Sequence, residues 1–249
     1  MATGMDAGPV NAPSLAPGPA RDGRFTVADR WVECANFPHG HPLRALEFLH
    51  RQMNEEVDSL ECSARNLGDF PAEDWTIRLA LARQCSDEAR HAAMFARLVK
   101  SRGGRLGEYP ILNFQYRIVT SIRSLVGRLA VQNRSFEAGG LDAIAAGIEE
   151  ARRSGDAELA QLFEAQRADE IDHVRFANDW IQSVTRKDPR GVLEIGAALN
   201  AASRGFHQVM GDEGTAGVSY PADIAGRREA GFTDAEVQLA SRLQARAER

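Results

Sequence analysis

The chain has 249 residues, of which 43% are apolar and 26% charged, and its net charge is −5 at pH 7. This composition is ordinary for a globular protein, and the negative charge gives no electrostatic reason to expect binding to nucleic acid or to an anionic membrane. No apolar run approaches the roughly 20 residues that cross a bilayer, so we expect no membrane-spanning segment.

The N-terminal stretch is rich in Ala, Gly and Pro and lacks the apolar segment of a secretory signal. We predict a flexible tail over residues 1–24, a helical bundle over residues 25–190, and a helical extension over residues 191–249 that packs on the bundle. The three cysteines, Cys34, Cys62 and Cys85, form no C-x-x-C pattern, and such free thiols favour a cytoplasmic location.

Helical periodicity begins after the tail. Apolar residues recur at spacings of three and four from about Pro42 to Leu67 and again from about Glu73 to Arg102, which predicts two long helices. The first ends before "GDFP" and the second at "GG", where turn residues interrupt the pattern.

A longer loop, "RGGRLGEYPILNF", leads to a third predicted helix over about Gln115 to Gly155. The fourth begins at "SGD", with Ser154 or Asp156 as its N-cap, and ends near "RKDPRG". From Val192 we expect one helix, a "GDEGTAG" loop and a short final helix that opens at Thr233, and we find no convincing strand alternation. Two helical hairpins joined by a longer connection predict an all-α four-helix bundle with one long crossover and extra C-terminal helices.

The motif Asp-Glu-x-x-His occurs twice, as "DEARH" in the second predicted helix and "DEIDH" in the fourth. In both copies the Glu and the His lie on the apolar stripe and project from the same side of the helix. Another stripe Glu precedes each copy, and the interval from that Glu to the motif Glu is the same in both halves to within one position. The repeated set is Glu56, Glu88 and His91, then Glu137, Glu170 and His173.

Buried Glu and His side chains are costly unless something binds them. Four carboxylates and two imidazoles nearly neutralise a pair of divalent ions, and carboxylates can change their binding mode as a metal changes oxidation state. We therefore predict that the six residues hold two metal ions, either two irons or an iron and a manganese.

Each motif begins with an aspartate, Asp87 or Asp169. A ligating histidine usually donates its other N–H group to a carboxylate. From the two-fold repeat we predict that Asp169 orients His91 and that Asp87 orients His173.

Glu55 is an alternative to Glu56, because the interval from Glu55 to Glu88 equals the one between the corresponding glutamates of the second half. For Glu61 and Asp142 we favour a solvated face or helix pairing over a role in the site. Four further side chains are candidates for a substrate pocket or for ordinary polar core positions: Thr120, Asn133, Gln166 and Trp180.

With these motifs the chain resembles the ferritin-like di-iron carboxylate proteins and, more narrowly, the DUF455 group. The stretches that carry the resemblance span about Leu43 to Val237: "EVDSLEC", "FPAEDW", "DEARHAAMF", "RSFEAGGLDAI", "DEIDHVRFA" and "RREAGFTDAEV". The resemblance implies a ferritin-like bundle whose di-iron cluster reacts with O2.

Our first hypothesis is a non-haem di-iron oxidase or oxygenase that oxidises a small organic substrate, such as an amine or amino acid of specialised metabolism. Expected partners are O2 as co-substrate and an external electron donor, and we expect a monomer or homodimer. One alternative is a tRNA hydroxylase resembling the MiaE proteins, against which the net charge argues. Another is iron storage or peroxide scavenging; of these, storage would require a large assembly.

Overall fold

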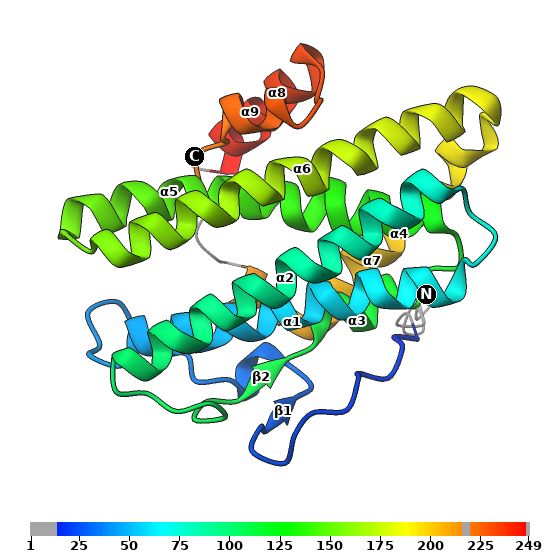
Figure 1. The fold of residues 1–249 in the computed structure, drawn as a ribbon. Coiled ribbons are helices and arrows are strands. Elements are labelled where there is room, and N and C mark those ends of the chain that lie inside the picture. Colours follow the sequence, from blue (N-terminus) through cyan, green and yellow to red (C-terminus); the bar gives the residue numbers. More distant parts are fainter. Residues whose placement is uncertain (1–13, 216–219, 248–249) are drawn as a thin grey trace, which may run out of the picture.

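The computed structural model describes residues 14–215 and 220–247. Within these ranges helices make up nearly all of the regular structure (Figure 1), which confirms the prediction of an all-α chain. No helix in the described part of the chain combines the length and the apolar character needed to cross a membrane.

The first hairpin consists of α1 (Arg44–Asp69) and α2 (Trp75–Ser101), which pack along one another. The Asp74 carboxylate accepts the backbone N–H groups of Thr76 and Ile77 and so fixes the start of α2. Both helices lie within about two residues of their predicted positions, in line with the usual uncertainty of helix ends.

The second hairpin consists of a π-helix, η2 (Gln132–Glu137), continued by α5 (Ala138–Ser154), and of α6 (Ala157–Lys187). Gly155 ends α5 in a left-handed conformation with φ of 77°, as helix C-termini often require. Of the two proposed N-caps, it is Asp156 that accepts the backbone N–H of Leu159 at the start of α6, at 3.1 Å. Figure 1 shows the α5–α6 pair lying over the α1–α2 pair.

The prediction of a single helix over about Gln115 to Gly155 is wrong. The structure divides this segment into α3 (Phe114–Val119), α4 (Leu125–Val131), η2 and α5. The Thr120 hydroxyl donates to Tyr116 O at the end of α3, and the Ser124 hydroxyl accepts the N–H of Gly127 at the start of α4. These local bonds satisfy the free helix ends at the break. The hydrophobic periodicity of a sequence does not distinguish polar residues that cap a break from polar residues within a continuous helix.

Two strands of two residues, β1 (Val27–Ala28) and β2 (Ile111–Leu112), pair in parallel beside α1 and are too short to produce visible alternation in the sequence. A single 3₁₀ turn, η1 (Trp31–Glu33), follows β1. Of the predicted flexible tail, residues 1–13 lie outside the described residues, whereas residues 14–24 lie against the body. Leu15 packs on the apolar core, and Arg21 forms an ion pair with Glu61 at 2.7 Å.

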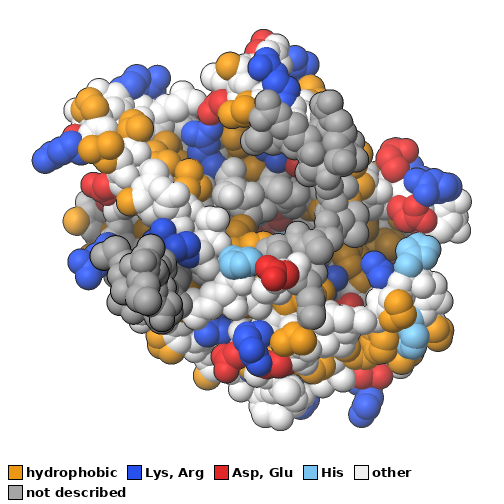
Figure 2. Space-filling view, turned by 180° about the vertical axis from the view of Figure 1, so that it is seen from behind, with side chains coloured by type: hydrophobic (Ala, Val, Ile, Leu, Met, Phe, Trp, Pro, Cys, Tyr) orange, Lys and Arg blue, Asp and Glu red, His pale blue; other side chains and the backbone are white. Residues whose placement is uncertain are grey.

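The C-terminal part contains α7 (Arg190–Thr215), α8 (Ile224–Glu229) and α9 (Asp234–Ala247). Gly211, the first residue of the predicted "GDEGTAG" loop, interrupts α7 with φ of 63°, and the last two residues of that loop lie outside the described residues. Asp223 and Arg227 attach α8 to the second hairpin through ion pairs with Arg167 and Asp142, both at 2.6 Å. On the described part of the face in Figure 2, basic side chains lie interspersed with acidic ones.

Two apolar layers flank the centre of the two hairpins. One layer contains Leu49, Met53, Phe95 and Phe163, and the other contains Ile77, Leu81, Leu129 and Ile181. On α2 and α6, the polar residues of the repeated motif lie between these layers along the helix. The fold therefore isolates the middle of the bundle from solvent along its axis.

Candidate metal centre

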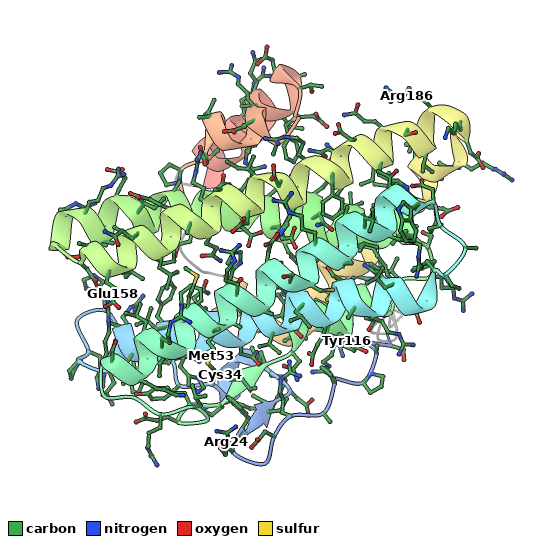
Figure 3. The ribbon with its side chains drawn as sticks, viewed as in Figure 1. Arg24, Cys34, Met53, Tyr116, Glu158 and Arg186 are labelled. Carbon is green, nitrogen blue, oxygen red and sulfur yellow. The ribbon has the colours of Figure 1, made fainter. Side chains whose placement is uncertain are left out.

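The six side chains predicted as metal ligands come from four segments of the chain. Glu56 lies on α1, three residues after Met53 (labelled in Figure 3), and Glu137 lies at the end of η2. The helix α2 supplies Glu88 and His91, and α6 supplies Glu170 and His173 from its central turns, between Glu158 near its start and Arg186 near its end (Figure 3). All six side chains are buried.

These side chains form two overlapping groups whose potential ligand atoms lie within 4.8 Å of one another in each group. The first group is Glu56, Glu88, His91 and Glu170, and the second is Glu88, Glu137, Glu170 and His173. Glu88 and Glu170 belong to both groups. Each group could therefore hold a metal ion, and two carboxylates are common to both groups.

In both histidines Nδ1 faces the carboxylates. His91 Nδ1 lies 3.2 Å from Glu56 Oε2 and 3.3 Å from Glu88 Oε2, and His173 Nδ1 lies 3.4 Å from Glu170 Oε2. The two imidazole centroids are 6.4 Å apart. Nδ1 of His91 thus points into the first group, and Nδ1 of His173 points into the second.

The opposite ring nitrogens reach the two aspartates in the predicted crossed pattern. His91 Nε2–H donates to Asp169 Oδ2 at 3.0 Å, and His173 Nε2–H donates to Asp87 Oδ2 at 3.4 Å. Arg90 then joins the two aspartates, because its Nη2 donates to Asp87 at 3.1 Å and to Asp169 at 2.6 Å. These bonds fix each imidazole with Nδ1 pointing inward.

The structure separates the two glutamates that the spacing left open. Glu55 turns away from the site and pairs with Arg51 at 3.2 Å, whereas Glu56 joins the first group. Glu61 pairs with Arg21 of the N-terminal stretch and Asp142 pairs with Arg227, and both acids lie outside the two groups; only Asp142 pairs one helix with another.

Two of the four polar candidates contact the site. Gln166 Nε2 donates to Glu56 Oε1 at 2.8 Å, and Asn133 Nδ2 donates to Glu137 Oε2 at 2.8 Å. Thr120 instead bonds to a backbone carbonyl at the end of α3, and Trp180 packs beside an apolar layer.

Sequence reasoning missed three further side chains at the site, namely Ser59, Gln84 and Gln132, each of which donates a hydrogen bond to a site carboxylate. A signal for one of them was present. Gln84 lies four residues before Glu88, as Gln166 does before Glu170, so the repeated motif extends to Gln-x-x-Asp-Glu-x-x-His.

The family model described as "Protein of unknown function (DUF455)" matches residues 5–238, which is most of the chain. The chain belongs to the DUF455 family. No curated protein and no solved structure matches it. The narrower resemblance found in the sequence is thereby confirmed for this DUF455 protein.

Burial raises the pKa of three site carboxylates in this DUF455 protein, Glu56, Glu137 and Glu170, and that of Glu137 rises to about 8. Burial favours the neutral form of Glu88 too, but its hydrogen bond with His91 and the charge of His173 lower its pKa to about 2. Burial therefore favours the protonated forms of Glu56, Glu137 and Glu170, with which a metal ion competes, whereas Glu88 is held as a carboxylate.

We expect metal affinity to rise with pH between pH 6 and pH 8. Burial favours neutral imidazoles, but the adjacent carboxylates raise the pKa of His91 to about 11 and that of His173 well above its usual value. Metal binding requires the neutral imidazole, and protons compete with the metal for it. Raising the pH by one unit is therefore expected to increase the metal affinity by roughly tenfold for each proton displaced. Chelator competition at pH 6, 7 and 8 measures the trend, and a flat or falling affinity would contradict it.

Replacing Asp169 by Asn is expected to weaken metal binding by roughly 10- to 100-fold, because the neutral amide no longer stabilises His91 in its ligating orientation. Asp172→Asn is the matched control, since Asp172 lies three residues further along α6 and pairs with Arg175 outside both groups. Chelator competition on both variants at one pH makes the comparison. Equal affinities in the two variants would count against an orienting role for Asp169.

Proposed function

We propose that this DUF455 protein is a ferritin-like, non-haem di-iron oxidase or oxygenase that uses O2 to oxidise a small organic substrate. The observation that carries the proposal is the pair of buried groups that share Glu88 and Glu170. An amine or amino acid of specialised metabolism is the substrate class we favour.

The donor set fits two iron ions. Four carboxylates balance the charge of two divalent cations, and oxygen donors with neutral imidazole suit iron and manganese. A zinc site would more commonly contain cysteine, whereas the three cysteines of this chain lie outside both groups. So many buried acidic side chains would destabilise the fold if they had no partner. Their burial therefore favours a bound cation.

When bound, a pair of ferrous ions supplies electrons for the reduction of O2. The protein would contribute the surroundings of that reaction. Asp87 and Asp169 keep the histidines in their ligating orientation, and Gln166 and Asn133 hold individual carboxylates. The apolar layers on either side exclude water from the site.

Anaerobic loading with ferrous ion, desalting and exposure to O2 test the proposal. We expect about two irons per chain and uptake of O2 that a suitable small amine accelerates. The doubly substituted Glu88→Ala/Glu170→Ala chain is the control and should do neither. Failure of the wild-type chain to retain iron, or retention without reaction with O2, would count against the proposal.

The same preparation separates the alternative functions. Light scattering of a large assembly would favour iron storage, and a salt-sensitive shift of tRNA would favour a tRNA hydroxylase. A monomer or dimer that leaves tRNA unshifted supports the oxidase or oxygenase.

A further inference from the structure

The site has an approximate two-fold relationship between its halves, and two glutamines obey it. Gln166 on α6 donates to Glu56 Oε1 at 2.8 Å, and Gln84 on α2 donates in the same way to Glu137 Oε1. Each glutamine lies four residues before a shared glutamate and holds the unshared glutamate of the other half. To this extent the unshared carboxylates Glu56 and Glu137 are held alike.

Beyond the glutamines, the two carboxylates differ. Three more donors reach Glu137: Ser59 Oγ lies 3.1 Å from Oε1 and shares its hydrogen with Glu88 Oε1 at 2.8 Å, Gln132 Nε2 lies 3.2 Å from Oε1, and Asn133 Nδ2 donates to Oε2 at 2.8 Å. Glu56 contacts His91, itself a ligand candidate, and has no equivalent of these three donors among the described contacts. The position that corresponds to Ser59, three residues after Glu137, is Gly140, which has no side chain to donate.

The π-helix accounts for the difference. Its wider turn brings residues five positions apart onto one face, so that both Gln132 and Asn133 reach Glu137. The corresponding residues of α1, Arg51 and Gln52, lie five and four positions before Glu56 on a regular helix. Both of them bind Glu55 instead, at 3.2 and 2.7 Å.

We propose that the two metal positions are inequivalent and fill in order: the position of Glu137 and His173 takes the first ion, and that of Glu56 and His91 takes the second. Gln84 and Asn133 donate to the Glu137 carboxylate, and Ser59 and Gln132 lie beside it as shared donors, so the carboxylate is held before an ion arrives and binding there costs little further ordering. Three of them meet at Oε1, whereas Oε2 accepts from Asn133 alone and therefore has the more available lone pair for the ion. Glu56, held by Gln166 alone apart from its contact with His91, keeps the freedom to move. The inference rests on the proposed di-metal function.

Titration of the metal-free full chain with Co²⁺, followed by calorimetry and by the visible absorption of the bound ion, tests the order. We expect two steps whose dissociation constants differ by roughly tenfold or more. Glu56→Gln should lose the weak step and keep the tight one, whereas Glu137→Gln should lose the tight step. Two equal steps in the wild-type chain, or loss of the tight step in Glu56→Gln, would overturn the inference while leaving the proposed di-metal function intact. Absence of any Co²⁺ binding would overturn both.

A second pair of variants tests the cause. Gln132→Leu removes one donor to Glu137 and is expected to weaken the tight step by roughly tenfold. Gln52→Leu changes the corresponding residue of α1, which does not contact Glu56, and should leave both steps unchanged. Ser59→Ala, a smaller change, provides a second measurement if Gln132→Leu does not fold; because Ser59 also donates to the shared Glu88, the expected result is a larger weakening of the tight step than of the weak one. A tight step that neither donor variant weakens would overturn the assignment of its strength to these donors.

Discussion

Replacing Glu170 by alanine is expected to remove both metal ions from this DUF455 protein, whereas Glu56→Ala is expected to remove one. Glu170 belongs to both groups of ligand candidates and Glu56 to one of them. Loss of a shared carboxylate would take one ligand candidate from each group and one negative charge from the surroundings of both ions. We expect the iron content after anaerobic loading and desalting to fall from about two ions per chain to about none in Glu170→Ala.

Glu55→Ala is the matched control for this comparison, because Glu55 is the neighbouring acid on α1 and pairs with Arg51 away from the site. Its iron content should stay at the wild-type level. The thermal unfolding temperature of each metal-free variant separates metal loss from misfolding. A wild-type iron content in Glu170→Ala would show that Glu170 is not a shared ligand.

Arg128→Met is expected to lower the free energy of unfolding by about 3 kcal/mol, because Arg128 holds the break in the crossover together. Its guanidinium is buried and donates to the carbonyl oxygens of Thr120 and Ile122 and to Asn66 Oδ1, at 3.3, 2.8 and 3.1 Å. It also pairs with Asp69 at 2.8 Å and stacks on Phe70. Methionine fills a similar volume without a donor, so these buried acceptors lose their partners.

Urea unfolding of the metal-free protein measures the change, with the midpoint shifted and the slope preserved. Arg65→Met is the control, since Arg65 pairs with the same Asp69 but its side chain is 54% exposed. Exposed pairs contribute little, so this variant should unfold close to the wild type. Equal midpoints for the two variants would mean that the carbonyl contacts of Arg128 do not stabilise the crossover.

The sequence predicted which residues gather at the site more completely than it predicted the path of the chain. Helical periodicity and the spacing of the motifs were enough to identify four of the residues, because side chains on one face of a helix recur at helical intervals. These four are Glu88, His91, Glu170 and His173. Glu55 and Glu56 are adjacent on α1 and differ by about a quarter turn, so spacing alone could not separate them. The structure resolves them through the Arg51 and Gln52 contacts that engage Glu55.

The crossover could not be predicted in the same way. The break between α3 and α4 depends on Arg128. Its side chain donates hydrogen bonds to the backbone carbonyl groups of Thr120 and Ile122, which precede it in the chain. The π-helix is equally hidden, because its apolar and polar positions fit a regular helix almost as well. Ser59 and Gln132 become part of the site only through these long-range arrangements.

The division of the six site residues between two hairpins also bears on the order in which the protein is made. A nascent chain that has reached α3 can offer only Glu56, Glu88 and His91, whereas the other three residues lie in η2 and α6. A domain generally folds as a unit once its segments have been synthesised. The six residues therefore cannot come together until His173 has been synthesised and the late hairpin has docked onto the early one.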